Sequence, residues 1–254
     1  MLRVMSLSSR SVVLACLTLA LLTHPSCTLQ GVARADTPFS AGTTVLFQGD
    51  SITDAGRSRQ PAHADTPNEA RGLGRGYASF AAASILTTAA PEDVRVFNRG
   101  VSGNKVFQLA QRWQEDCLDL QPDIVSVLIG VNDIWHTRNG NYDGTPAIYE
   151  RDYDTLLQRT RDALPGVRLV VCEPFVLMCG AVDDSWFPEF DKYRAASRRV
   201  AAKHDAVFIP FHSMFTEALA HHPAEHWARD GVHPTRAGAA LMAKAWLEGV
   251  AQSR

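Results

Sequence analysis

Short apolar runs alternate along the chain with stretches of helical periodicity, and this alternation limits the fold more than any other feature. The runs have the length and the β-branched or aromatic content of buried strands, and they cover residues 43–48, 94–98, 124–129, 167–172 and 206–210. The helical stretches cover residues 77–88, 106–118, 148–164, 190–203 and 236–251. Strands and helices that alternate in this way form βαβ units, whose parallel sheet is covered by helices on both faces. The sequence therefore predicts a single α/β domain with a five-stranded parallel sheet.

The first 35 residues have the organisation of a secretory signal peptide. Arg3 and Arg10 give a basic start, an apolar run follows over residues 12–22, and Ala33-Arg34-Ala35 supplies small residues at a cleavage site. The apolar run is too short to span a bilayer. We expect cleavage near Ala35, a mature domain over residues 36–254, and a secreted or periplasmic protein without stable membrane association. The alternative is an uncleaved N-terminal anchor.

Charge and cysteine content narrow the classes of partner. The formal net charge of the whole chain is −2, and removal of residues 1–35, which hold three arginines and no acidic residue, makes the domain more acidic. Its basic residues are scattered, which excludes nucleic acid as a partner. Cys117, Cys172 and Cys179 remain, so either Cys172 and Cys179 are bridged or all three are reduced thiols. No Cys/His cluster has zinc-ligand spacing, so no metal is expected. A homo-oligomer is left open.

Four polar segments fall where reactive groups collect in a parallel sheet, beyond the carboxyl ends of the strands. Three of them follow predicted strands, and the fourth precedes the last helix; they are 49–54 (GDSITD), 98–103 (NRGVSG), 130–133 (GVND) and 230–234 (DGVHP). Glycine permits the sharp turn and the close approach of backbone N–H groups that such segments need. The four segments together predict a catalytic site rather than four unrelated loops.

These segments supply every group that ester hydrolysis requires. We predict Ser51 as nucleophile, His233 as general base and Asp230 as the carboxylate that orients the imidazole. The N–H groups of Ser51 and Gly103 and the side-chain amide of Asn132 are the expected oxyanion hole. The chain has no G-x-S-x-G elbow, so an ordinary α/β-hydrolase fits poorly.

The four segments resemble the sequence blocks of the SGNH (GDSL-type) hydrolase superfamily. The block serine matches Ser51, followed by Ile52 where leucine is usual; Gly103 matches the block glycine, with Gly100 as a rival. The resemblance implies a flavodoxin-like three-layer α/β/α sandwich and no cofactor. Residues 49–57, 74–77, 112–116 and 129–135 are further similar to the acetylxylan-esterase-like branch.

This resemblance implies a secreted serine esterase that removes O-acetyl or other short acyl groups from carbohydrates such as xylan or its oligomers. Trp135 and Trp227 are candidates for stacking on a sugar ring. Arg57 and Arg75 are expected in surface salt bridges rather than in the pocket, and Asp50 and Asp54 in loop hydrogen bonds. The alternatives are a lysophospholipase or thioesterase of the same superfamily and a non-catalytic carbohydrate-binding module.

Overall fold

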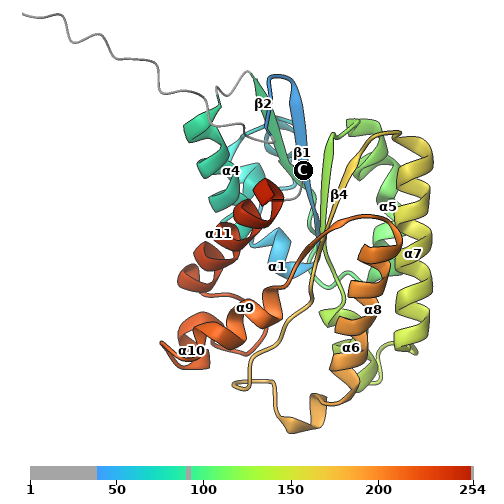
Figure 1. The fold of residues 1–254 in the computed structure, drawn as a ribbon, viewed down its shortest axis with the longest axis vertical. Coiled ribbons are helices and arrows are strands. Elements are labelled where there is room, and N and C mark those ends of the chain that lie inside the picture. The colour runs from blue at the N-terminus through green and yellow to red at the C-terminus, as the bar shows by residue number, and fades with distance from the viewer. Residues whose placement is uncertain (1–38, 90–92, 253–254) are drawn as a thin grey trace, which may run out of the picture. The chain divides into compact units, whose positions relative to one another are not determined.

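The computed structural model describes residues 39–89 and 93–252, and every described element lies in the unit Asp36–Arg254. The expected signal peptide, residues 1–35, lies outside the described residues. The strands are β1 (Thr43–Gly49), β2 (Val94–Asn98), β3 (Ile124–Leu128), β4 (Arg168–Cys172) and β5 (Val207–Ile209). They form one sheet in the order β2-β1-β3-β4-β5, with all pairs parallel (Figure 1). The predicted five-stranded parallel sheet and flavodoxin-like α/β class are confirmed.

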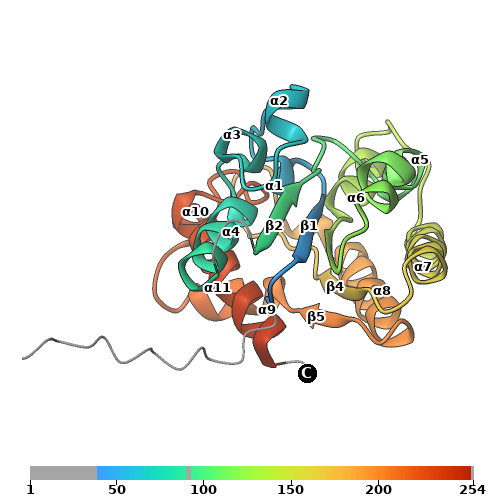
Figure 2. The same cartoon turned by 90° about the horizontal axis from the view of Figure 1, so that it is seen from above.

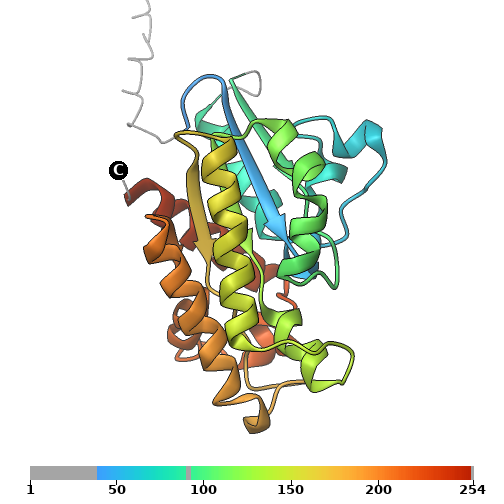
Figure 3. The same cartoon turned by 90° about the vertical axis from the view of Figure 1, so that its right-hand side faces the viewer.

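Helices cover both faces of this sheet (Figures 1 and 2). One layer contains α4 (Tyr77–Thr88), α9 (Phe211–Ala218) and α11 (Arg236–Gln252), with α4 packed on α11. The other contains α5 (Val106–Asp116), α7 (Pro146–Ala163) and α8 (Glu189–Lys203), with α7 in contact with both α5 and α8 (Figure 3). All five predicted helical stretches are therefore helices, with small differences at their ends.

Several short helices are additional to those expected from periodicity. They are α1 (Ser51–Asp54), α2 (Pro61–Ala64), α3 (Ala70–Leu73), α6 (Val131–Arg138), α10 (Ala224–Trp227) and the 3-10 turns Leu118–Leu120 and Asp184–Trp186. Four of these helices span only one turn, which is too short for an apolar period to show in sequence. Two of the additional helices, α1 and α6, begin at the carboxyl ends of β1 and β3, so they place polar residues of the site.

The core ties the last helix to the middle of the sheet. The Trp246 indole of α11 lies 4.8 Å from the Phe47 ring of β1, and its Nε1 donates to Ser126 Oγ of β3 at 2.9 Å. Trp246, Phe47 and Ser126 are all buried, so these contacts hold the second half of α11 against the sheet. The helix begins at Arg236, shortly after the segment 230–234, so its packing limits where that segment can lie.

One sequence question, the state of the cysteines, is answered by the described part of the chain. Cys117, Cys172 and Cys179 are all free thiols, so the reduced alternative holds in this structure. Between residues 39 and 252, leaving aside 90–92, we find no helix of the length and hydropathy that a membrane span requires.

Candidate active site

Ser51 is presented at the carboxyl end of β1 by a turn that only glycine can make. Gly49 has φ +155°, and a Cβ there would clash with the carbonyl oxygen of Leu128 on β3. Asp50 then caps α1, because its Oδ1 accepts from the N–H of Ile52 at 3.0 Å. Ser51 is the first residue of α1, so the side chain leaves the sheet just where ligands bind in parallel sheets.

The three residues predicted as nucleophile, base and orienting carboxylate form one hydrogen-bonded chain. Ser51 Oγ lies 2.9 Å from His233 Nε2, and His233 Nδ1 lies 2.6 Å from Asp230 Oδ2. The second oxygen of Asp230 accepts from the backbone N–H groups of Val232 and His233 at 3.0 and 2.7 Å. With the Nδ1 proton directed at Asp230, Nε2 is free to accept the serine proton.

Asp230, the carboxylate of this hydrogen-bonded series, is kept ionised. Partial burial alone would raise the pKa of Asp230, but the hydrogen bonds from His233 and Val232 outweigh burial and hold that pKa below its usual value. An ionised carboxylate stabilises the imidazolium that forms when His233 takes a proton. The geometry and the charge state therefore suit a base rather than a structural histidine.

The loop that carries Asp230 is clamped by the segment that follows β4. A Cβ at Gly231, which has φ +82°, would clash with the carbonyl oxygens of Leu177 and Cys179. In return, the Leu177 N–H donates to the Gly231 carbonyl at 2.8 Å. Gly180 packs so closely on Asp230 that any side chain there would meet its backbone. Residues 177–180 thus position Asp230. The sequence did not predict this role, because these residues do not resemble a catalytic motif.

The predicted oxyanion donors come from two loops that meet. Asn132 lies in the first turn of α6, is buried, and its Nδ2 donates to the backbone oxygen of Asn104 at 3.3 Å. Asn104 directly follows Gly103, so the amide of Asn132 is joined to the loop that carries Gly103. The structure therefore places Asn132 beside the loop of Gly103, and the role of the two residues as oxyanion donors stays a prediction.

The rival glycines of the second block differ in their surroundings. Gly100 is packed against the end of α1, where a Cβ would clash with the backbone N of Asp54. Its carbonyl accepts from Arg57 Nε at 2.7 Å and its N–H donates to Asn98 Oδ1 at 2.9 Å. Gly103 has φ +81° and open space where a Cβ would lie. This difference indicates that Gly100 serves packing. It favours Gly103 as the oxyanion donor.

Asp54 joins residues 99–103, called the glycine loop below, to the helix α1 that begins with Ser51. Its Oδ2 accepts from the N–H and the hydroxyl of Ser102 at 3.0 and 3.1 Å and from Arg59 at 2.6 Å. Burial would raise the pKa of Asp54, but the hydrogen bonds from Arg59 and Ser102 bring that pKa below its usual value. The loop hydrogen bonds expected of Asp50 and Asp54 are both present.

Arg112 of α5 braces the same loop from the other side and was not predicted as a site residue. Its guanidinium donates to the carbonyl oxygens of Arg99 and Gly49 at 2.7 and 3.3 Å, and to Asn104 Oδ1 at 2.8 Å. One side chain therefore joins the ends of β1 and β2 to the residue that Asn132 contacts. The similarity of residues 112–116 to the esterase branch was the available signal, although it gave no role.

The two tryptophans proposed for sugar stacking occupy different settings. The half-buried Trp135 ring lies 6.3 Å from the His233 ring and 5.7 Å from that of Trp186. The Trp227 ring packs edge-on against His226 at 4.6 Å, and the Trp227 backbone oxygen supports the loop after His233 through a hydrogen bond. Trp135 is beside the catalytic triad of Ser51, His233 and Asp230. The Trp227 ring, in contrast, contacts its own helix.

A half-open pocket of about 380 Å³ adjoins the nucleophile and the base. Its lining residues are Ser51, Ile52, Ala55, Arg75, Gly76, Tyr77, His233, Pro234, Thr235, Arg236 and Ala239. No aspartate or glutamate is among them. Among the described residues there is no group of three or more His, Cys, Asp or Glu side chains that could hold a metal ion.

The expectation of surface salt bridges for Arg57 and Arg75 is wrong for both. Arg57 is buried and donates to a backbone oxygen, because its segment folds under the glycine loop. Burial lowers the pKa of Arg57 to about 10, a value at which the guanidinium stays charged at neutral pH. Arg75 is exposed, lines the pocket and forms no ion pair with any described residue.

Two buried carboxyl groups lie beneath the site. Burial raises the pKa of Asp50 and that of Asp133 to about 7 each. Asp133 follows Asn132 on α6 and accepts from the N–H of Val106 at 3.3 Å. The Oδ2 atoms of Asp50 and Asp133 have no hydrogen-bond partner, which agrees with carboxyl groups that resist ionisation.

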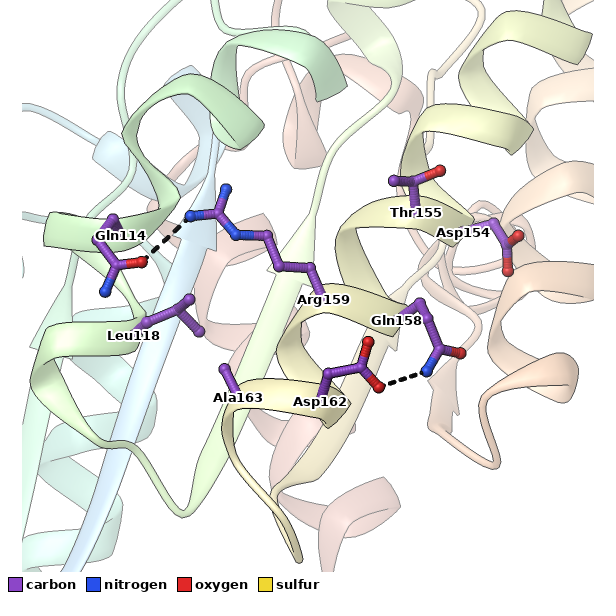
Figure 4. A pocket seen from close by; sticks show the side chains of 8 residues that line it. All are labelled: Gln114, Leu118, Asp154, Thr155, Gln158, Arg159, Asp162 and Ala163. Atoms are coloured by element: carbon purple, nitrogen blue, oxygen red, sulfur yellow. Dashed lines mark hydrogen bonds between the residues drawn. The ribbon is translucent and has the colours of Figure 1, made fainter.

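A larger cavity lies away from these residues, in a groove between α5 and α7 (Figure 4). It measures about 630 Å³ and is lined by Gln114, Leu118, Asp154, Thr155, Gln158, Arg159, Asp162 and Ala163. None of the residues predicted for catalysis or binding lines it. The groove is therefore a separate region of the surface.

A Ser-His-Asp chain at the carboxyl ends of a parallel sheet defines the class of serine hydrolases. Comparison with known proteins then gives the family: the sequence model of the GDSL-like lipase/acylhydrolase family matches residues 47–241. The chain belongs to this family and is a carboxylic ester hydrolase.

Relatives with solved structures share the fold over nearly their whole length. An acetylxylan esterase from Geobacillus stearothermophilus is 32% identical over 215 residues, which cover 83% of this chain and 94% of the relative. A crystal structure of that esterase superposes with a TM-score of 0.73 at 30% identity, over 84% of this chain and 95% of the other. A protein described as a GDSL-like lipase from Parabacteroides merdae gives a TM-score of 0.80 at 43% identity, over 84% and 97% of the two chains.

Proposed function

We propose that this protein removes O-acetyl groups from carbohydrates such as xylan or its oligomers, with Ser51 as nucleophile. The observation that carries the proposal is the hydrogen-bonded chain from Ser51 through His233 to Asp230. The similarity to an acetylxylan esterase supports the choice of acetyl group and sugar. A binding module that only held a sugar would have no use for an assembled chain of this kind.

The proposed reaction has two steps. Ser51 Oγ attacks the acetyl carbonyl carbon as its proton passes to His233 Nε2, and the oxyanion is held by the N–H groups of Ser51 and Gly103 and by Asn132 Nδ2. The ester C–O bond then breaks, and the sugar oxygen takes the proton from His233. A water molecule, deprotonated by His233, attacks the acetyl-serine and releases acetate and the free hydroxyl of Ser51.

The surface around the site supports a short acyl group. The pocket is small, and its lining is largely polar or of small side chains. Among the described residues, the only large hydrophobic side chains with substantial exposure are Met178 and Leu219. A long acyl chain needs a continuous apolar surface. The lysophospholipase and thioesterase alternatives are therefore less favoured.

We propose export as part of this function, on the strength of residues 1–35 of the sequence. A polymeric substrate such as xylan would be met outside the cytoplasm. N-terminal sequencing of protein recovered from the periplasm or medium should begin at Asp36. A start at Met1 in the cell pellet would overturn the proposal.

The function is tested by acetate release from acetylated xylan, together with cleavage of p-nitrophenyl esters of increasing chain length. The wild type should release acetate and should lose ester activity steeply beyond short chains. Ser51→Ala should abolish both, whereas Ser84→Ala, a matched change at an exposed serine of α4, should leave both unchanged. Ser51-dependent cleavage of long esters with untouched xylan would overturn the substrate and leave the nucleophile standing.

A further inference from the structure

The pocket beside the nucleophile contains two positive charges and no negative one. Arg75 and Arg236 line the pocket together with Ser51 and His233. Neither arginine forms an ion pair or a side-chain hydrogen bond to any residue that the structure describes. Both are exposed, so their guanidinium groups are available to a ligand that reaches the triad. The formal net charge of the whole chain is −2, so this pair of cations does not follow from an overall basic surface.

Each guanidinium is held in place by an apolar or backbone contact instead of by a carboxylate. Arg236, the first residue of α11, lies 5.3 Å from the centre of the Phe80 ring. Arg75 lies over Gly56, where a Cβ would come within 2.8 Å of Nη2. Gly56 has φ +72°, and its missing side chain leaves room for the guanidinium. Such contacts reduce the freedom of each arginine and leave its N–H donors unpaired.

We propose that Arg75 and Arg236 form a carboxylate subsite, which binds a uronic acid unit of an acetylated oligosaccharide next to the sugar that carries the acetyl group. The planar guanidinium donates two parallel hydrogen bonds to a carboxylate, a geometry that a neutral sugar cannot offer. This inference rests on the proposed carbohydrate esterase function and adds a charged substituent to its substrate.

The test compares binding of two deacetylated xylo-oligomers of equal chain length, one with a 4-O-methylglucuronic acid branch and one without. Affinities are measured by isothermal titration calorimetry on the full chain at low salt, so no turnover is needed. We expect the acidic oligomer to bind about tenfold more tightly, as one well-placed charged hydrogen-bonding contact allows. In the double variant Arg75→Gln/Arg236→Gln this ratio should fall to about twofold or less, because neither amide carries charge.

A matched control uses Arg95→Gln, an exposed arginine early in the edge strand β2, far from the carboxyl ends of the sheet. It should keep the tenfold ratio. Because the ratio is taken within each variant, a general loss of folded protein affects both oligomers alike.

Three results would overturn the inference: equal affinity of the two oligomers in the wild type, a ratio that survives in the double variant, or no binding of the acidic oligomer. Acetate and inorganic phosphate are titrated in parallel. If either binds as tightly as the acidic oligomer, the arginines bind small anions and the uronic acid is excluded. Failure of the proposed function is seen separately, as an absence of acetate release from acetylated xylan.

Discussion

The groove between α5 and α7 and the pocket beside Ser51 differ in how far their polar side chains are paired with one another. In the groove between α5 and α7, Arg159 donates to Gln114 and Gln158 donates to Asp162, at 3.3 and 2.8 Å (Figure 4). The pocket at the carboxyl ends of the strands is smaller, yet it holds the serine-histidine pair and two arginines without partners. The polar side chains of the groove are hydrogen-bonded to other described residues, whereas those of the two arginines of the pocket are not. Unpaired donors and acceptors, rather than volume, mark the site.

The sharpest test of this contrast is removal of the base. His233→Ala leaves Ser51 without a proton acceptor, so kcat for p-nitrophenyl acetate should fall roughly 10⁴- to 10⁶-fold. His221→Ala changes an exposed histidine and serves as the control. If the His233 variant kept more than a tenth of the wild-type rate, the pocket would not be the catalytic site.

The second test removes one oxyanion donor. Asn132→Ala should lower kcat by about 10²- to 10³-fold with little change in KM, because the donor acts on charge that develops only in the transition state. Asn139→Ala, at the exposed end of α6, is the matched control. A change in KM alone would assign Asn132 to substrate binding and would leave the oxyanion hole incomplete.

The parts of the site that could be predicted from sequence are those with a chemical signature next to a strand. Ser51, Asn132 and His233 carry reactive groups, and the buried parallel strands before two of them are visible as apolar runs. Arg112 and the clamp at Leu177–Gly180 could not be found this way, since their roles depend on contacts between segments distant in sequence. The expectation for Arg75 was wrong for a related reason: only the fold shows that no carboxylate of the described residues forms an ion pair with this exposed arginine.

The third test compares Gly100 and Gly103, two glycines of the loop after β2, by the stability of their alanine variants. Gly100→Ala would push a Cβ into the backbone at the end of α1, so the free energy of unfolding should drop by about 3 kcal/mol. Gly103→Ala has open space and should cost only about 1 kcal/mol for its left-handed backbone. Urea unfolding of both variants measures the difference. Equal losses would contradict a packing role that belongs to Gly100 alone.

The fourth test uses two carboxyl groups whose pKa values are shifted in opposite directions: that of Asp133, beneath the site, is raised, and that of Asp154, in the groove, is lowered. Burial raises the pKa of Asp133 to about 7, so the folded chain retains a proton that the unfolded chain loses above about pH 4. Stability should therefore fall as the pH rises from 5 to 8, and Asp133→Asn should reduce that fall by on the order of 2 kcal/mol. In this variant Asp50 still has its raised pKa, so part of the dependence of stability on pH remains.

The groove supplies the control for this pH test. Asp154 has a lowered pKa because Lys203 and His204 donate to it, so its stabilisation is complete above the usual aspartate pKa and is lost only on strong acidification. Asp154→Asn should leave the change between pH 5 and pH 8 as in the wild type. Thermal unfolding at the two pH values checks both variants. A flat wild-type profile would mean that Asp133 ionises freely.

The smallest effect is expected in the groove itself. Arg159 donates to the Ala110 carbonyl at 3.2 Å and to Gln114 at 3.3 Å, both in exposed positions. Exposed contacts of this kind contribute about 0–1 kcal/mol, so Arg159→Gln should shift the melting temperature by roughly 3 °C at most. Its kcat/KM for p-nitrophenyl acetate should stay within about twofold of the wild type, because small surface changes rarely exceed ~0.5 kcal/mol. A tenfold loss of activity without a loss of stability would show that α5 transmits changes from the groove through Arg112 to the oxyanion loop, and the two cavities would then be coupled rather than separate.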